Sequence, residues 1–204
     1  MISSKVYLLN IDDVKKYKRG FFEEYFPERL KRAEKFVFEK DKLRCLGVAV
    51  ALGKVLNIHE SDLSYGEYGK PYSDKAGVSF SISHSGDYVA LAVSDTDIGV
   101  DIQKNNREPK DNAYRILTED EIGYLNGRPQ KEFFKIWSLK ESLSKAVGKG
   151  IHIGFSEIDT TPFLHKLPLL YSSQQYFANV VEIDNYYITI CTKNTQSLSF
   201  IEKM

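Results

Sequence analysis

Two short segments near the middle of the chain constrain its fold more than any other feature. Residues 99–103 (GVDIQ) alternate apolar and polar side chains, as in a half-buried strand, so Asp101 and Gln103 share one face. Residues 133–147 have helical apolar spacing, and Glu141 and Lys145 lie one turn apart on that helix. If strand and helix pack together, oxygens of Asp101, Gln103 and Glu141 converge. Such a set suits a hard cation such as Mg²⁺, with Lys145 placed to bind a phosphate.

Each segment alone also fits an ordinary structural role. An aspartate at a strand end commonly faces solvent or caps a turn. Glu141 and Lys145, spaced by four, commonly form a surface ion pair worth about 0.3–0.5 kcal/mol. The functional interpretation therefore depends on the rest of the chain.

Further motifs stand around these segments in a fixed order: residues 69–71 (GKP), 80–86 (FSISHSG), 137–145 (WSLKESLSK) and 148–150 (GKG), after a basic stretch at 27–44. In this order the chain resembles the surfactin-synthetase-activating (Sfp-type) 4′-phosphopantetheinyl transferases. That family combines a glycine-hydrophobic-Asp-hydrophobic-Glu strand with a Trp-x-x-Lys-Glu-(Ala/Ser)-x-x-Lys helix ending in Gly-x-Gly. The resemblance covers roughly residues 27–154, and an ordered set of motifs is hard to obtain by chance.

The resemblance implies an α+β fold, the 4′-phosphopantetheinyl transferase fold, with two similar halves related by a pseudo-twofold axis and the ligand in the cleft between them. Residues 1–104 would form the half that binds the 3′-phosphate and adenine and supplies the first metal ligand. Residues 105–204 would form the half with the carrier docking segment and the signature helix. The implied reaction transfers the phosphopantetheine arm of coenzyme A to a serine of an apo acyl or peptidyl carrier protein and releases adenosine 3′,5′-bisphosphate.

Carried over residue by residue, the resemblance makes Asp101, Gln103 and Glu141 the ligands of Mg²⁺, with Mn²⁺ as the alternative metal. Glu141 and Lys145 become the catalytic residues, with Glu141 as the base for the serine proton. The residues expected to bind coenzyme A are Arg29, Arg32, Arg44, Lys70, Pro71, Ser83, His84, Lys140 and Lys145. Among these, the arginines would hold the 3′-phosphate because guanidinium forks match phosphate oxygens.

One residue departs from the family pattern. Gln103 stands where the family usually has a second strand carboxylate, and a carboxamide oxygen ligates Mg²⁺ without contributing charge. A protein that binds coenzyme A or carrier proteins without catalysis therefore remains an alternative. Another Mg²⁺-dependent nucleotide transferase is disfavoured, because the chain has no P-loop and no Gly-x-Gly-x-x-Gly segment.

The carrier protein is expected to dock on the segment after residue 111, which combines apolar side chains with one positive charge. The candidates are Tyr114, Arg115, Ile116, Leu117 and Leu125. Such a patch suits an acidic amphipathic helix. The same apolar residues are equally compatible with the core of a helix at 118–126.

Composition agrees with these expectations without suggesting them. The chain has 204 residues, 42% hydrophobic and 27% charged, and its 28 basic residues balance 28 acidic ones. With no net charge, the chain has no overall electrostatic attraction to nucleic acid or to an anionic membrane. No apolar run approaches the ~20 residues of a membrane span. Cys45 and Cys191 are isolated and are expected to be buried. We therefore expect a cytoplasmic monomer.

The remaining patterns predict further elements. The N-terminal residues predict a first strand, and residues 27–56 predict a long helix broken near Asp41. Strands are expected at 78–83, 88–93 and 98–102, and a hairpin at 176–192. Thr118 followed by Glu121 indicates a capped helix start, while residues 105–111 indicate a hinge.

Overall fold

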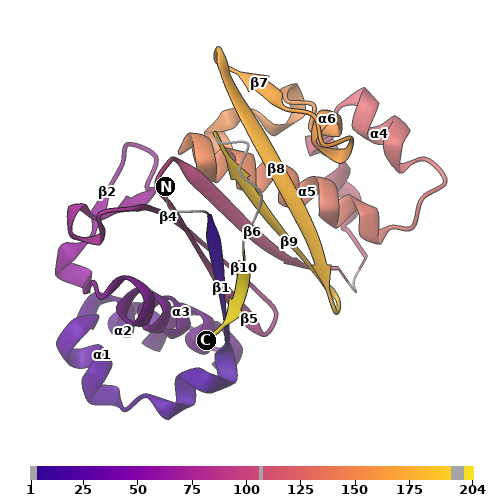
Figure 1. Cartoon of the computed structure of the whole chain (residues 1–204). Coiled ribbons are helices and arrows are strands. Elements are labelled where there is room, and N and C mark those ends of the chain that lie inside the picture. The colour runs from indigo at the N-terminus through magenta and orange to yellow at the C-terminus, as the bar shows by residue number, and fades with distance from the viewer. Residues whose placement is uncertain (1–3, 106–107, 194–199) are drawn as a thin grey trace.

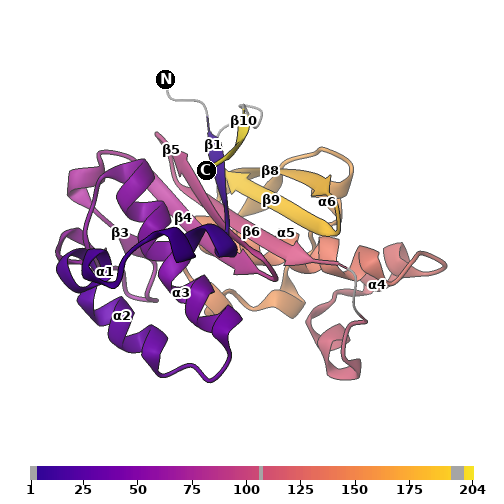
Figure 2. The ribbon, with the colours of Figure 1, turned by 90° about the horizontal axis from the view of Figure 1, so that it is seen from below.

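The computed structural model describes residues 4–105, 108–193 and 200–204, and Figures 1 and 2 show two sheets lying between groups of helices. The first sheet has the order β10-β1-β5-β4 and the second the order β6-β9-β8-β7. Helix α3 covers the outer face of the first sheet, with α2 packed against α3, and α5 covers the outer face of the second sheet. The predicted α+β class is confirmed.

The first sheet consists of β1 (Lys5–Asn10), β4 (Ser79–Ser85), β5 (Tyr88–Ser94) and β10 (Phe200–Lys203). The second consists of β6 (Ile98–Lys104), β7 (Leu169–Tyr171), β8 (Gln174–Ile183) and β9 (Tyr186–Thr192). A separate hairpin is formed by β2 (Ser64–Tyr65) and β3 (Pro71–Tyr72). The helices are α1 (Arg19–Tyr25), α2 (Pro27–Glu34), α3 (Glu39–Ala51), α4 (Glu119–Leu125), α5 (Lys131–Val147) and α6 (Thr161–Leu164).

Alternating side chains on β5 explain the stacking of the layers. Val89 and Leu91 belong to the apolar cluster under the α2 and α3 helices. Ala90 and Ala92 face the other way and join the cluster that includes Val100 of β6. Burial of apolar area on both faces of the first sheet therefore holds the two halves of the chain together.

Most of the predicted elements are confirmed. The first strand, the three strands of the middle segment and the hairpin β8–β9 are present, and Thr118 with Glu121 forms a complete capping box at the start of α4. Cys45 and Cys191 are buried free thiols. Among the described residues, no helix combines the length and apolar character needed to cross a bilayer.

Two features differ from the prediction or extend it. The helix expected at 27–56 is interrupted at residues 35–38, ahead of Asp41, where Val37 and Phe38 are exposed. Strand β10 was not predicted; it pairs in parallel with β1 in the first sheet. Each half of the chain thus contributes one strand to the sheet of the other half, because β6 pairs with β9 in the second sheet and β10 pairs with β1 in the first. The boundary after residue 104 remains a prediction.

Candidate active site

Strand β4 lies along the free edge of β6 and contacts it through serine side chains. The Ser81 hydroxyl accepts a hydrogen bond from the Val100 amide (3.0 Å), and the Ser85 hydroxyl accepts one from the Lys104 amide (3.0 Å). Between them, the Ser83 hydroxyl donates to Asp101 Oδ1 (2.7 Å). These hydroxyls satisfy edge groups that a further strand would otherwise pair, so β6 can end the second sheet beside β4.

Asp101 lies at the centre of the site. Its side chain is 6% exposed, and its Oδ1 accepts hydrogen bonds from Ser83 and from the Lys145 ammonium (2.8 Å). Its Oδ2 is buried and has no hydrogen-bond partner among the described residues. A buried carboxylate oxygen without a partner is costly unless a ligand or a cation completes it.

Helix α5 brings a second carboxylate and a cation to Asp101. Lys145 Nζ lies 2.8 Å from Asp101 Oδ1 and 3.8 Å from Glu141 Oε2. Burial raises the pKa of Glu141; the charge of Lys145 opposes this shift, and the charge of Asp101 adds to it. Two carboxylates thus share one ammonium, whereas the sequence analysis placed a metal ion between them and assigned Lys145 to a phosphate.

The close approach of β6 and α5 depends on Gly99. A Cβ at this position would lie 1.9 Å from the Ser142 carbonyl oxygen and 2.4 Å from the Ala146 amide nitrogen. Only glycine therefore lets the strand backbone contact the helix backbone here. The Ser138 hydroxyl reinforces the packing by donating to Thr189 Oγ1 of β9 (2.7 Å).

The donor set at Asp101 fits a divalent cation that prefers oxygen. Two carboxylates converge there, and one of them has a free buried oxygen. Among the described residues, no group of three or more His, Cys, Asp or Glu side chains is placed to hold a metal. Gln103 is buried and lines a pocket of about 560 Å³ whose other walls are both charged and aromatic, with Glu108, Lys110, Phe133 and Trp137.

A cationic pocket of about 310 Å³ adjoins the site. Its lining includes the predicted residues Arg29, Arg32, Arg44 and His84. Arg44 is held by the Gly86 carbonyl (2.7 Å) and by Asp41, whereas Arg29 Nε is buried without a partner in the described part of the chain. The pocket therefore presents several positive groups, one of them with a buried unsatisfied donor, and this suits a phosphate.

His84 faces this pocket from β4. Phe80, Ile82 and His84 share one face of this strand, on which Phe80 is buried, Ile82 is half-buried and His84 is exposed. Burial of part of the ring lowers the pKa of His84, and the neighbouring cation Arg44 lowers it further. A neutral imidazole can donate one N–H to an anion without adding charge.

Pro71 and Lys70 lie between the cationic pocket and α5. Pro71 lines the cationic pocket, and both residues line a smaller cavity of about 210 Å³ that also includes Lys145. The Lys70 ammonium points to main-chain carbonyls of β6 and α5 and away from the cationic pocket. The side chain of Lys70 thus contacts protein where the sequence analysis expected coenzyme A.

Lys140 is not brought to the site, which corrects its assignment as a coenzyme ligand. Its side chain is 1% exposed, and its ammonium pairs with Glu121 (2.8 Å) and donates to the carbonyls of Phe155 (2.7 Å) and Ile158 (2.6 Å). Glu121 also accepts from Thr160. This saturated buried pair joins α4, α5 and the segment before α6, and sequence analysis did not identify Glu121 as the partner.

The predicted docking segment divides between surface and core. Tyr114 and Arg115 are exposed, Ile116 and Leu125 are half-buried, and Leu117 is buried with Phe133 and Phe134. Leu117 therefore belongs to the core, one of the two alternatives for these residues.

Comparison with known proteins gives consistent matches. A family model described as the 4′-phosphopantetheinyl transferase superfamily matches residues 97–191. Three curated relatives are 4′-phosphopantetheinyl transferases: gsp of Aneurinibacillus migulanus (34% identical over 58% of this chain and 54% of that protein), Sfp of Bacillus subtilis (32%, 62% and 62%) and AcpT of Salmonella typhimurium (31%, 68% and 70%).

The matched part spans only about half to three fifths of the first two of these relatives. Among solved structures, the holo-[acyl-carrier-protein] synthase of Thermotoga maritima aligns with a TM-score of 0.33 and 22% identity. That alignment covers 47% of this chain and 61% of the other.

Proposed function

The chain belongs to the Sfp-type 4′-phosphopantetheinyl transferases, and from this membership we propose that it transfers the phosphopantetheine arm of coenzyme A to a serine of an apo carrier protein. One observation carries the proposal. The buried free oxygen of Asp101 lies beside Lys145 and Glu141, and a cationic pocket adjoins them. Such an arrangement suits a pyrophosphate substrate with a further phosphate.

The donor is proposed to lie across the two cavities. The guanidinium groups of Arg29, Arg32 and Arg44 would bind the 3′-phosphate, since all three line one cavity and Arg29 Nε is a buried donor without a partner in the described part of the chain. Lys145 and His84 would bind the pyrophosphate, with Ser83 holding Lys145 (3.1 Å). Pro71 borders both cavities and would lie along the adenosine.

Asp101 and Glu141 would hold a divalent cation, with Gln103 contributing a neutral oxygen. Mg²⁺ is the proposed ion and Mn²⁺ the alternative; when bound, it would neutralise charge on the pyrophosphate. Lys145 forms ion pairs with both carboxylates (2.8 Å to Asp101 and 3.8 Å to Glu141).

The proposed reaction is an in-line displacement at the β-phosphorus of coenzyme A. The serine oxygen of the carrier forms a bond to that phosphorus, and the bond to the bridging pyrophosphate oxygen breaks. Adenosine 3′,5′-bisphosphate leaves with that oxygen, and Glu141 accepts the serine proton. Burial, which raises the pKa of Glu141, suits this carboxylate to act as a base. Positioning and charge neutralisation supply most of the rate in such transfers.

The carrier would approach over the exposed pair Tyr114 and Arg115, with Ile116 and Leu125 at its border. An apolar surface with a positive charge suits an acidic amphipathic helix. We further propose a cytoplasmic monomer, since the described cysteines are free thiols and one chain supplies both sides of the site.

The test is an intact-mass measurement on apo carrier proteins of fatty-acid, polyketide and peptide synthesis. Each carrier is incubated with the protein, coenzyme A and Mg²⁺. We expect the mass of one phosphopantetheine arm to be added to at least one carrier and to be lost when EDTA is present. The proposal fails if no carrier gains mass while all of them are modified by a known transferase.

A non-catalytic protein that binds coenzyme A or carriers is the second candidate, and Gln103 is the observation that favours it. A missing carboxylate weakens a metal site. Coenzyme A binding without any transfer would move this candidate to first place.

Replacing Gln103 by glutamate is expected to lower the Mg²⁺ concentration that gives half-maximal transfer by about tenfold, because metal affinity rises with the charge of its ligands. A magnesium titration of the transfer rate measures this shift. The matched control is Gln175→Glu, which adds the same charge at an exposed position on β8. An unchanged titration in Gln103→Glu would show that Gln103 is not a ligand.

A further inference from the structure

The hairpin of β2 and β3 forms one wall of both donor cavities. Its Tyr65, Gly69 and Pro71 line the cationic pocket with Arg44 and His84. Its Tyr68, Gly69 and Pro71 line the smaller cavity that contains Lys145. A rigid hairpin would therefore present a preformed surface to the nucleotide.

Little apolar burial holds this hairpin in place. Each of its strands has two residues, and Tyr65, Tyr68 and Tyr72 are all exposed. The Gly66 amide donates to the Lys70 carbonyl (2.9 Å) and closes the turn, in which Gly69 has a φ of +80°. These bonds shape the hairpin but do not attach it to the rest of the protein. Isolated two-stranded hairpins are marginally stable.

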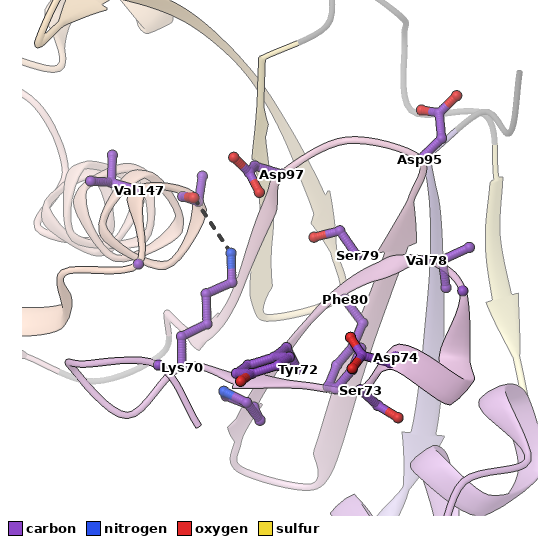
Figure 3. Close-up of a pocket in the computed structure, with 15 residues that line it drawn as sticks. Lys70, Tyr72, Ser73, Asp74, Val78, Ser79, Phe80, Asp95, Asp97 and Val147 are labelled. Atoms are coloured by element: carbon purple, nitrogen blue, oxygen red, sulfur yellow. Dashed lines mark hydrogen bonds between the residues drawn. The ribbon is translucent and has the colours of Figure 1, made fainter. Parts of the chain in front are cut away.

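Lys70 attaches the hairpin to the opposite half of the fold. Figure 3 shows its side chain extending from the hairpin to the end of helix α5, where the ammonium donates to the Ala146 carbonyl (3.4 Å). The same ammonium donates to the Ile98 carbonyl (3.1 Å) at the start of β6. Lys70 thus joins the last turn of α5 to the strand that carries Asp101.

The contacts of Lys70 are not those of a surface ion pair. No carboxylate in the described part of the chain lies within 4.0 Å of its ammonium, whose acceptors are neutral carbonyls. One of them is at the negative end of α5, where a cation is favoured. Burial lowers the pKa of Lys70, and the charge of Asp97 opposes this shift.

We propose that Lys70 is a positioning residue. It holds the β2–β3 hairpin, which lines both donor cavities, against β6 and α5, the two elements that carry Asp101 and Glu141. Ala146 directly follows Lys145 on α5, and Ile98 lies three residues before Asp101 on β6. Its hydrogen bonds to both carbonyls fix the distance between the hairpin and the carboxylate site at Asp101. Lys70 acts through Gly69 and Pro71 and not by touching coenzyme A. The effect of Lys70 on arm transfer rests on the proposed function, whereas its attachment of the hairpin does not.

The test compares Lys70→Met, which keeps the length of the side chain but removes its donors, with Lys70→Arg, which retains donors and charge. Lys75→Met is the matched control, since the exposed Lys75 lies on the adjacent turn η4 (Asp74–Ala76) and pairs only with Asp62 among the described residues. Hydrogen exchange is measured for residues 64–72. Calorimetry gives Kd for adenosine 3′,5′-bisphosphate, and steady-state kinetics separates kcat from KM.

In Lys70→Met we expect exchange of the hairpin amides to accelerate about tenfold and Kd to rise about tenfold, with kcat at saturating coenzyme A within about twofold of the parent. Lys70→Arg should recover most of both changes, and Lys75→Met should change neither. A higher Kd with unchanged exchange would mean direct contact with the ligand and would overturn the inference. Unchanged exchange and Kd would overturn it as well. The exchange measurement needs no turnover, so its result stands even if no carrier is modified.

Discussion

Asp101→Asn and Glu141→Gln are each expected to lower the rate of arm transfer by about 10²–10³-fold without unfolding the protein. Asparagine keeps an oxygen for Ser83 and Lys145 but removes the charge on the buried, unpartnered side of Asp101. Glutamine removes both a ligand charge and the proposed acceptor of the serine proton. Loss of a single well-placed electrostatic group commonly lowers the rate by about 10²–10³-fold.

Intact mass of a carrier against time measures the loss, and circular dichroism with the thermal midpoint checks the fold. Asp97→Asn is the matched control: Asp97 lies directly before β6 and pairs with Lys193 (2.6 Å) away from the carboxylates. It should retain the parent rate. Transfer above about a tenth of the parent rate in Asp101→Asn or Glu141→Gln would contradict the role given to that residue.

The strand and helix at the centre of the site were predictable because both patterns depend on local periodicity. Alternation placed Asp101 on the face opposite Val100, and a spacing of four placed Lys145 beside Glu141; the structure has both arrangements. The serines of β4 also follow this rule, since Ser81, Ser83 and Ser85 alternate. Sequence analysis used Ser83 alone and missed the shared contact of all three with β6.

The family resemblance assigned Lys140 to coenzyme A, but the spacing of residues along the helix already places it on another face. One residue along a helix is a rotation of about 100°, so Lys140 points away from the stripe that carries Glu141 and Lys145. Its buried pairing with Glu121 depends on the packing of α4, which lies outside any local pattern. The same reason explains β10: a short strand pairs with β1 across nearly the whole chain, and no periodicity records such a partner.

Gly99→Ala is expected to reduce the free energy of unfolding by about 3 kcal/mol, because the added methyl group has no space. The atoms it would meet are the Ser142 oxygen at 1.9 Å and the Ala146 nitrogen at 2.4 Å, both in the backbone of α5. A rotamer change cannot relieve such contacts, so β6 and α5 must separate. That separation moves Asp101 away from Lys145, and transfer should fall with stability.

Urea denaturation measures the stability, and the mass assay measures the transfer rate under conditions where the variant is folded. Gly123→Ala is the matched control, since a Cβ at this position of α4 meets no atom within 4 Å. Alanine there should be neutral or stabilise by up to about 1 kcal/mol through helix propensity. If Gly99→Ala were as stable and active as Gly123→Ala, close contact between the two backbones would not be what brings the carboxylates together. Reduced transfer in folded Gly99→Ala would instead link the site directly to the strand–helix distance.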